Sequence, residues 1–117
     1  MEAVPGRILV VDDELDLAEA LETNLSRQGF DVKSTTSPKQ ALQLISSGRF
    51  ALLLSDMMMP EMDGLALLQE ALQVDPQLVG IIMTGQATVQ TAIDAMKIGA
   101  FDYLLKPFKF EAVMPII

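Results

Sequence analysis

Apolar positions along the chain follow two different periods, one typical of buried strands and one typical of amphipathic helices. Short, nearly continuous apolar runs predict strands covered on both faces, and apolar residues three or four positions apart predict helices. The predicted strands are residues 7–11, 30–35, 51–55, 78–83 and 101–105. The predicted helices run from after residue 14 to about 27, then over 37–48, about 64–74 and about 88–98. Strand 30–35 alternates more than the others, which favours a position near a sheet edge.

Helix ends and helix faces are predicted from the same pattern. Ser37 followed by Pro38 is typical of a helix start, and glycine at residues 29, 48 and 99 is typical of a helix end. Helix 64–74 is expected to bury three leucines: Leu65, Leu68 and Leu72. Helix 88–98 is expected to face inward with four residues: Val89, Ala92, Ile93 and Met96.

Strand and helix alternate five times, which predicts an α/β fold: a doubly wound, five-stranded parallel sheet with helices on both faces. Right-handed crossovers fix most of its topology. The last residues start another helix, but Pro115 would break it and the chain ends where further turns are expected. We therefore expect residues 1–117 to be one domain with a truncated last helix, cut from a longer protein whose output region lies beyond residue 117.

Composition and charge narrow the classes of function. The 117 residues carry a net charge of -8, which argues against direct nucleic-acid binding because phosphate backbones are bound by Lys and Arg. Cysteine and histidine are both absent, so thiolate metal sites and the usual zinc ligands are excluded. Neither a signal peptide nor a run of about 20 apolar residues is present. We expect a soluble, cytoplasmic domain that binds no membrane.

Charged and hydroxyl side chains stand where the central strands are predicted to end. The carboxyl ends of parallel strands share one edge of the sheet, where ligands bind. Five side chains are expected to meet at that edge: Asp12, Asp13, Asp56, Thr84 and Lys106. Three neighbouring carboxylates repel one another, and a hard divalent cation such as Mg²⁺ resolves that repulsion.

Asp56 is the candidate nucleophile, because a carboxylate can accept a phosphoryl group as an acyl phosphate. The Lys106 ammonium, the Thr84 hydroxyl and a metal ion would together stabilise the charge of the transferring group. Taken singly, each residue has a simpler explanation. An aspartate after a strand is more often a helix cap, and a threonine or lysine there is more often a turn residue.

Four motifs in order resemble the response-regulator receiver domain, CheY-like, over essentially the whole chain. They are Asp12-Asp13, the stretch from Asp56 through Met59-Pro60 to Met62-Asp63-Gly64, the triplet Met83-Thr84-Gly85, and residues 99–108 around Lys106-Pro107. Each motif alone is weak, whereas all four at these spacings are specific. The resemblance implies a flavodoxin-like sheet with strand order 2-1-3-4-5.

The resemblance also implies roles for individual residues. Asp56 would take its phosphoryl group from a phosphohistidine of a histidine kinase or phosphotransfer protein. Asp13, Asp56 and the backbone carbonyl of Met58 would hold Mg²⁺, with Asp12 acting through water. Thr84 and Lys106 would contact the phosphoryl oxygens, and a cis peptide would join Lys106 to Pro107.

A switch and a set of partners follow from the same resemblance. Thr84 and Tyr103 would form the switch pair, repacking the face of the fourth helix, fifth strand and fifth helix. That face would meet an output domain or effector, transcription regulation being one possible output, and would serve as the surface of a possible homodimer. Lys109 and Pro115 depart from the pattern expected for the last helix, and therefore bear on the dimer surface and not on the phosphorylation site.

Three other functions compete with this interpretation. A degenerate receiver would only bind partners, but each of the five residues at the strand ends has the type that the chemistry requires. A magnesium-dependent aspartyl-phosphate phosphatase usually carries a second acid two residues after its nucleophile, where this chain has Met58. A nucleotide or flavin binder needs a glycine-rich loop after a strand, where this chain has Asp12-Asp13-Glu14.

Overall fold

The computed structural model describes residues 7–48, 50–84 and 89–105. Strands and helices alternate in it, as the sequence pattern predicts. The strands are β1 (Arg7–Val11), β2 (Val32–Thr35), β3 (Phe50–Asp56), β4 (Val79–Thr84) and β5 (Asp102–Leu105). The helices are α1 (Leu15–Arg27), α2 (Pro38–Ser47), α3 (Gly64–Val74) and α4 (Val89–Ile98).

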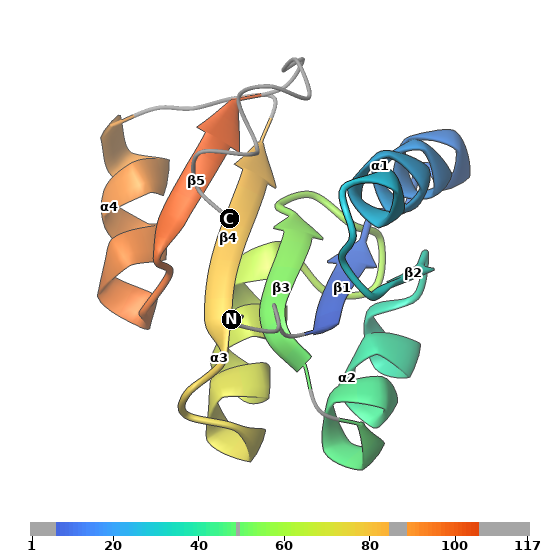
Figure 1. The fold of residues 1–117 in the computed structure, drawn as a ribbon. Helices are drawn as coiled ribbons and strands as arrows, with labels where there is room; N and C mark the ends of the chain where they lie inside the picture. Colours follow the sequence, from blue (N-terminus) through green and yellow to red (C-terminus); the bar gives the residue numbers. More distant parts are fainter. Residues whose placement is uncertain (1–6, 49, 85–88, 106–117) are drawn as a thin grey trace.

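All five strands form one parallel sheet in the order β2-β1-β3-β4-β5. This order confirms the predicted α/β fold, and it places β2 at an edge as its alternating pattern indicates. The strands therefore point the same way, and their carboxyl ends lie along one side of the molecule (Figure 1). The sheet order reverses between β1 and β3, and this is the point where ligands bind in open α/β sheets.

Two apolar layers cover the sheet, one on each face (Figure 1). Ala18, Leu21 and Leu25 of α1 pack on one face against residues such as Val10 and Leu54. On the other face, the second layer joins α2, α3 and α4 to the sheet through Ile45, Leu67, Leu68 and Ala95, among others. The central strands are buried on both sides, which explains why their sequences are continuous apolar runs.

Strand ends differ from the sequence prediction by one or two residues. Strand β2 begins at Val32 and not at residue 30, because the chain there still closes helix α1: Gly29 has a φ of +96° and the Phe30 amide donates to the Leu25 carbonyl at 3.3 Å. Strand β3 runs one residue further at each end than predicted, so Asp56 is its last residue. Strand β4 begins and ends one residue later than predicted, at Val79 and Thr84.

Helix starts are as predicted, but two buried faces are not. Ser37 caps α2, since its side chain accepts from the Gln40 amide at 3.2 Å, with Pro38 in the first turn. In α3 the fully covered leucines are Leu67 and Leu68, whereas Leu65 and Leu72 are only partly buried. The polar residues Gln69, Glu70 and Gln73 share one side of α3, and the apolar side opposite them is broader than the stripe that the sheet covers.

Helix α4 also differs from the prediction. Ile93 and Met96 are 41% and 42% exposed. Among the α4 side chains that the structure describes, Ala95 is buried in the core and Ile98 is partly buried against it. The side chains of Val89 and Ala92 lie outside the described residues, as do the predicted last helix and Pro115. Among the described helices, none has the length and hydropathy needed to span a bilayer.

Candidate metal and phosphoacceptor site

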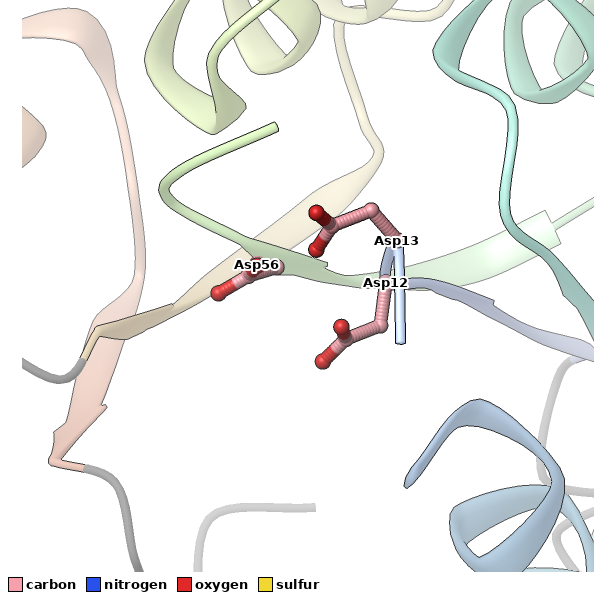
Figure 2. Close-up of side chains that lie close together, drawn as sticks. All are labelled: Asp12, Asp13 and Asp56. Atoms are coloured by element: carbon pink, nitrogen blue, oxygen red, sulfur yellow. The ribbon is translucent and has the colours of Figure 1, made fainter. Parts of the chain in front are cut away.

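Three carboxylates come together at the carboxyl edge of the two central strands. Asp56 is the last residue of β3, and Asp12 and Asp13 follow β1 directly. The pairing of Val11 with Ser55 makes the two strand ends neighbours. Figure 2 shows the side chains of Asp12, Asp13 and Asp56 gathered around one space beside these strand ends.

The carboxylates are close enough to share one ion. One oxygen from each of the three aspartates lies within 4.8 Å of the other two. Asp12 and Asp56 are buried, whereas Asp13 is exposed. Buried carboxylates at such distances repel strongly because water screens them little, and a cation between them removes that repulsion. An all-oxygen donor set of this kind fits Mg²⁺ or Ca²⁺ and does not fit a soft metal.

Asp12 is also part of the local backbone structure. Its amide donates to the Thr35 carbonyl at 3.2 Å, and its Oδ1 accepts from the Glu14 amide at 2.9 Å, just before α1. Asp12 is therefore not the cap of α1, because the N-cap residue is Glu14 and no side chain caps that helix; the Asp12 carboxylate closes the turn before it. This hydrogen bond is compatible with a role in the cluster, because an oxygen of Asp12 lies within 4.8 Å of oxygens of Asp13 and Asp56.

Thr84 ends the next strand of the sheet. Asp56 is paired with Met83 across β3 and β4, so Thr84 lies one residue beyond the partner of Asp56, and it is buried. Tyr103 is in β5 opposite Ile82, and its side chain lies outside the described residues. Lys106 and Pro107 lie wholly outside them, so their predicted roles and their cis peptide stay predictions.

The loop between β3 and α3 is closed by backbone hydrogen bonds. The Met57 amide donates to the Met83 carbonyl at 2.7 Å, and the Gly64 amide donates to the Met57 carbonyl at 2.7 Å. Asp63 caps α3 by accepting from the Ala66 amide at 2.8 Å. Met58, whose carbonyl is the fourth predicted metal ligand, lies in this loop with its side chain 71% exposed.

Two residues beside Asp56 make contacts that were not predicted from the sequence. Ser55 is fully buried and its hydroxyl donates to the Asp56 carbonyl at 3.0 Å. Gly64 packs so closely against Asp56 that a side chain there would strike its backbone. A hydroxyl inside the apolar run that ends at Ser55 was a visible signal. The close approach of Gly64 to the Asp56 backbone had no such signal in the sequence, because a glycine at the junction of a loop and a helix is common.

The family model of the response regulator receiver domain matches residues 8–117. The chain belongs to this family. Over 104 residues the receiver domain is 41% identical to the transcriptional regulatory protein ZraR of Escherichia coli (strain K12), and the match covers 89% of this chain and 24% of ZraR. The chain thus spans about a quarter of the length of that relative.

Solved receiver structures share the fold. A response regulator from Burkholderia pseudomallei with a phosphorylated aspartic acid, calcium ion and citrate matches with a TM-score of 0.88 and 30% identity, over 95% of this chain and 65% of that one. The beryllofluoride-activated NtrC4 receiver domain dimer matches with a TM-score of 0.87 and 32% identity, over 94% of this chain and 92% of that one.

Family, fold and acidic cluster agree on one general function. This receiver domain is a phosphoacceptor switch of two-component signalling, and it is a phosphoacceptor rather than a turnover enzyme. It binds a divalent metal through its acidic cluster. The family works with histidine kinases and output domains.

Proposed function

We propose that Asp56 is the phosphoacceptor of this receiver domain and that Mg²⁺ is its metal ion. The observation that carries the proposal is the cluster itself: oxygens of Asp12, Asp13 and Asp56 lie within 4.8 Å of one another, at the point where the sheet order reverses. Asp13, Asp56 and the carbonyl of Met58 would hold the ion directly, and Asp12 would act through water. A small octahedral ion that keeps some of its waters suits three protein oxygens.

The reaction is a transfer of one phosphoryl group. A carboxylate oxygen of Asp56 attacks phosphorus, the phosphorus–nitrogen bond of a phosphohistidine breaks, and the ring nitrogen keeps the bonding electron pair. The product on this chain is an acyl phosphate. Bound Mg²⁺ neutralises charge on the carboxylates and on the phosphoryl oxygens. Burial of Asp56 supports this role, because a restricted side chain would hold the attacking oxygen in one orientation.

Thr84 and Lys106 are proposed to contact the phosphoryl group. The Thr84 hydroxyl would donate to one oxygen, which is supported by its place on the strand next to Asp56. The Lys106 ammonium would act as a point charge on another oxygen. Thr84 and Tyr103 would then form the switch pair that changes the face of α4, β5 and the last helix. Slow hydrolysis of the acyl phosphate by the domain itself would return the switch to its resting state.

The partners are proposed from the relatives. A histidine kinase or histidine phosphotransfer protein would supply the phosphoryl group, and an output region beyond residue 117 would respond, which is supported by the greater length of the transcriptional regulatory protein ZraR. The NtrC4 receiver is a dimer when activated, which supports a homodimer of this chain through α4, β5 and the last helix. The absence of direct nucleic-acid binding by this domain and its cytoplasmic location stay predictions from the sequence.

The test is phosphorylation of the isolated chain with acetyl phosphate and Mg²⁺, read by intact mass. A single phosphoryl adduct is expected on the wild type, and none on Asp56→Asn or on the wild type with excess chelator. Asp63→Asn is the matched control, because it also removes a carboxylate from this region but keeps the hydrogen bond that caps α3.

Each result has a defined meaning. An adduct on Asp56→Asn would contradict the assignment of Asp56. Phosphorylation that survives the chelator would contradict the metal requirement. If neither acetyl phosphate nor a phosphorylated histidine kinase modifies the wild type, a protein-binding module becomes the better interpretation. Continuous release of phosphate from many donor molecules per chain would favour the phosphatase.

A further inference from the structure

Ser55 is a polar residue in an apolar layer. Its neighbours across the sheet are Val11 on β1 and Ile82 on β4, both fully or almost fully buried, and Ser55 itself is inaccessible to solvent. The hydroxyl donates to the carbonyl of Asp56 at 3.0 Å, which is the next residue along the chain. The hydrogen bond therefore acts on the peptide unit that begins the loop after the phosphoacceptor.

Gly64 contacts the same peptide unit from the other end of the loop. A Cβ atom at Gly64 would lie 2.2 Å from the Asp56 carbonyl oxygen, 3.0 Å from its carbonyl carbon and 3.1 Å from the Met57 Cα. All three atoms belong to the backbone, so no side-chain rotation could relieve the contact. Among the described residues only Gly29 and Gly99 have positive φ. Gly64 is therefore required for space and not for an unusual backbone conformation.

Two further hydrogen bonds hold Met57 in place. Its amide donates to Met83 on β4 and its carbonyl accepts from Gly64, both at 2.7 Å. The peptide unit between Asp56 and Met57 is thus fixed by a hydroxyl, by a close backbone contact and by strand pairing. On one side of this unit is the Asp56 carboxylate. On the other side comes the Met57–Met58 peptide unit, which is held by the hydrogen bond from the Gly64 amide to the Met57 carbonyl, and after it the unit that carries the Met58 carbonyl.

We propose that Ser55 and Gly64 are positioning residues that fix the Asp56–Met57 peptide unit, and so set the Asp56 carboxylate and the Met58 carbonyl at the spacing that one metal ion requires. The inference rests on the proposed function, because it uses the metal ligands assigned there. Two ligands only two residues apart in sequence can serve one ion only if the backbone between them has one conformation. Residues behind metal ligands commonly determine affinity in this way.

The experiment titrates Mg²⁺ alone into the chain by calorimetry, so that its readout does not depend on phosphorylation. The variants are Ser55→Ala and Gly64→Ala, with Gly80→Ala as the control. A Cβ at Gly80 would also clash, 2.3 Å from Leu68 Cδ1, but it would meet a side chain of α3 in the core and not the backbone of Asp56. Chemical denaturation measures how much each variant destabilises the fold.

Ser55→Ala and Gly64→Ala are expected to bind Mg²⁺ about tenfold or more weakly than the wild type, within the range known for residues behind metal ligands. Gly80→Ala is expected to keep the wild-type affinity even if it is equally destabilised. Should Gly64→Ala fail to fold, Ser55→Ala decides alone, since it removes a single hydroxyl.

Wild-type affinity in the folded variants would overturn the inference while leaving the proposed function intact. An equal loss of affinity in Gly80→Ala would also overturn it, because general loosening of the fold would then explain the effect. A wild-type chain that binds no Mg²⁺ would instead overturn the proposed metal site, and this inference with it.

Discussion

At the scale of single residues, the three aspartates differ in what they do besides gathering at one edge. Asp12 is hydrogen-bonded to the backbone of Thr35 and Glu14, and Asp56 is buried at the end of β3. Asp13 is exposed and contributes its carboxylate to the same cluster. Asp13 is therefore the position where the charge can be removed with the least disturbance of the fold.

Asp13→Asn is expected to change stability in opposite directions without and with Mg²⁺. Without the ion, removal of one of three mutually repelling charges should stabilise the fold, by on the order of 1 kcal/mol for a partly screened group. With the ion, the wild type gains about 2.7 kcal/mol at a Mg²⁺ concentration of roughly a hundred times Kd, and the variant should lose most of that gain. Thermal unfolding with and without Mg²⁺ measures both effects.

An unchanged Mg²⁺-induced rise in Tm for Asp13→Asn would remove Asp13 from the metal site. Asp63→Asn again provides the control, because Asp63 is an exposed carboxylate engaged in capping α3. It should keep the Mg²⁺ response of the wild type.

Residue by residue, the candidate site was only partly predictable. Asp12, Asp13 and Asp56 could be placed together because parallel strands end at a common edge, which is a consequence of topology alone. The roles inferred for Ser55 and Gly64 depend on distances between backbone atoms of β3 and α3. Such distances arise from tertiary packing, so the hydroxyl in an apolar run could draw attention to Ser55 but the sequence could not show what either residue contacts.

At the scale of the elements, the strands were easier to predict than the helix faces. A strand buried on both sides needs only an apolar run, whereas a helix must present one stripe among several candidates. Helix α3 has a broad apolar side that carries its four leucines, and the sheet fully covers only Leu67 and Leu68. Helix α4 packs on the sheet with Ala95 buried, and in this orientation Ile93 is exposed.

Substitutions on the two helices should separate the buried positions from the exposed ones. Leu68→Ala is expected to lower the free energy of unfolding by about 2–5 kcal/mol, because it opens a cavity in a fully buried layer. Ile93→Ser should change it by no more than about 0.5 kcal/mol, apart from a small loss of helix propensity. Urea denaturation measures both. A loss above about 2 kcal/mol for Ile93→Ser would restore the inward face predicted from the sequence.

At the scale of the whole molecule, strand–helix alternation was enough to predict the sheet and the two covering layers. The observed order β2-β1-β3-β4-β5 agrees with what the family resemblance implies. Exact strand ends were not predictable, because hydrogen bonds such as the one from Phe30 to Leu25 extend the end of α1 at the expense of β2. The proposed switch face consists of α4, β5 and the predicted last helix, so its described part is α4 and the backbone of β5.

The proposed homodimer gives the final prediction. Phosphorylation of the chain should convert monomers to dimers in sedimentation velocity, and Asp56→Asn should stay monomeric. Ile93→Ser should weaken the dimer without preventing phosphorylation, because Ile93 is an exposed apolar residue on α4 and its burial between two copies would contribute to association.

Val74→Ser is the matched control, since Val74 is also an exposed aliphatic residue, at 49%, but belongs to α3. A fully phosphorylated chain, verified by intact mass, that sediments as a monomer would contradict the dimer and leave the phosphoacceptor assignment untouched. A dimer weakened as much by Val74→Ser as by Ile93→Ser would locate the interface away from α4.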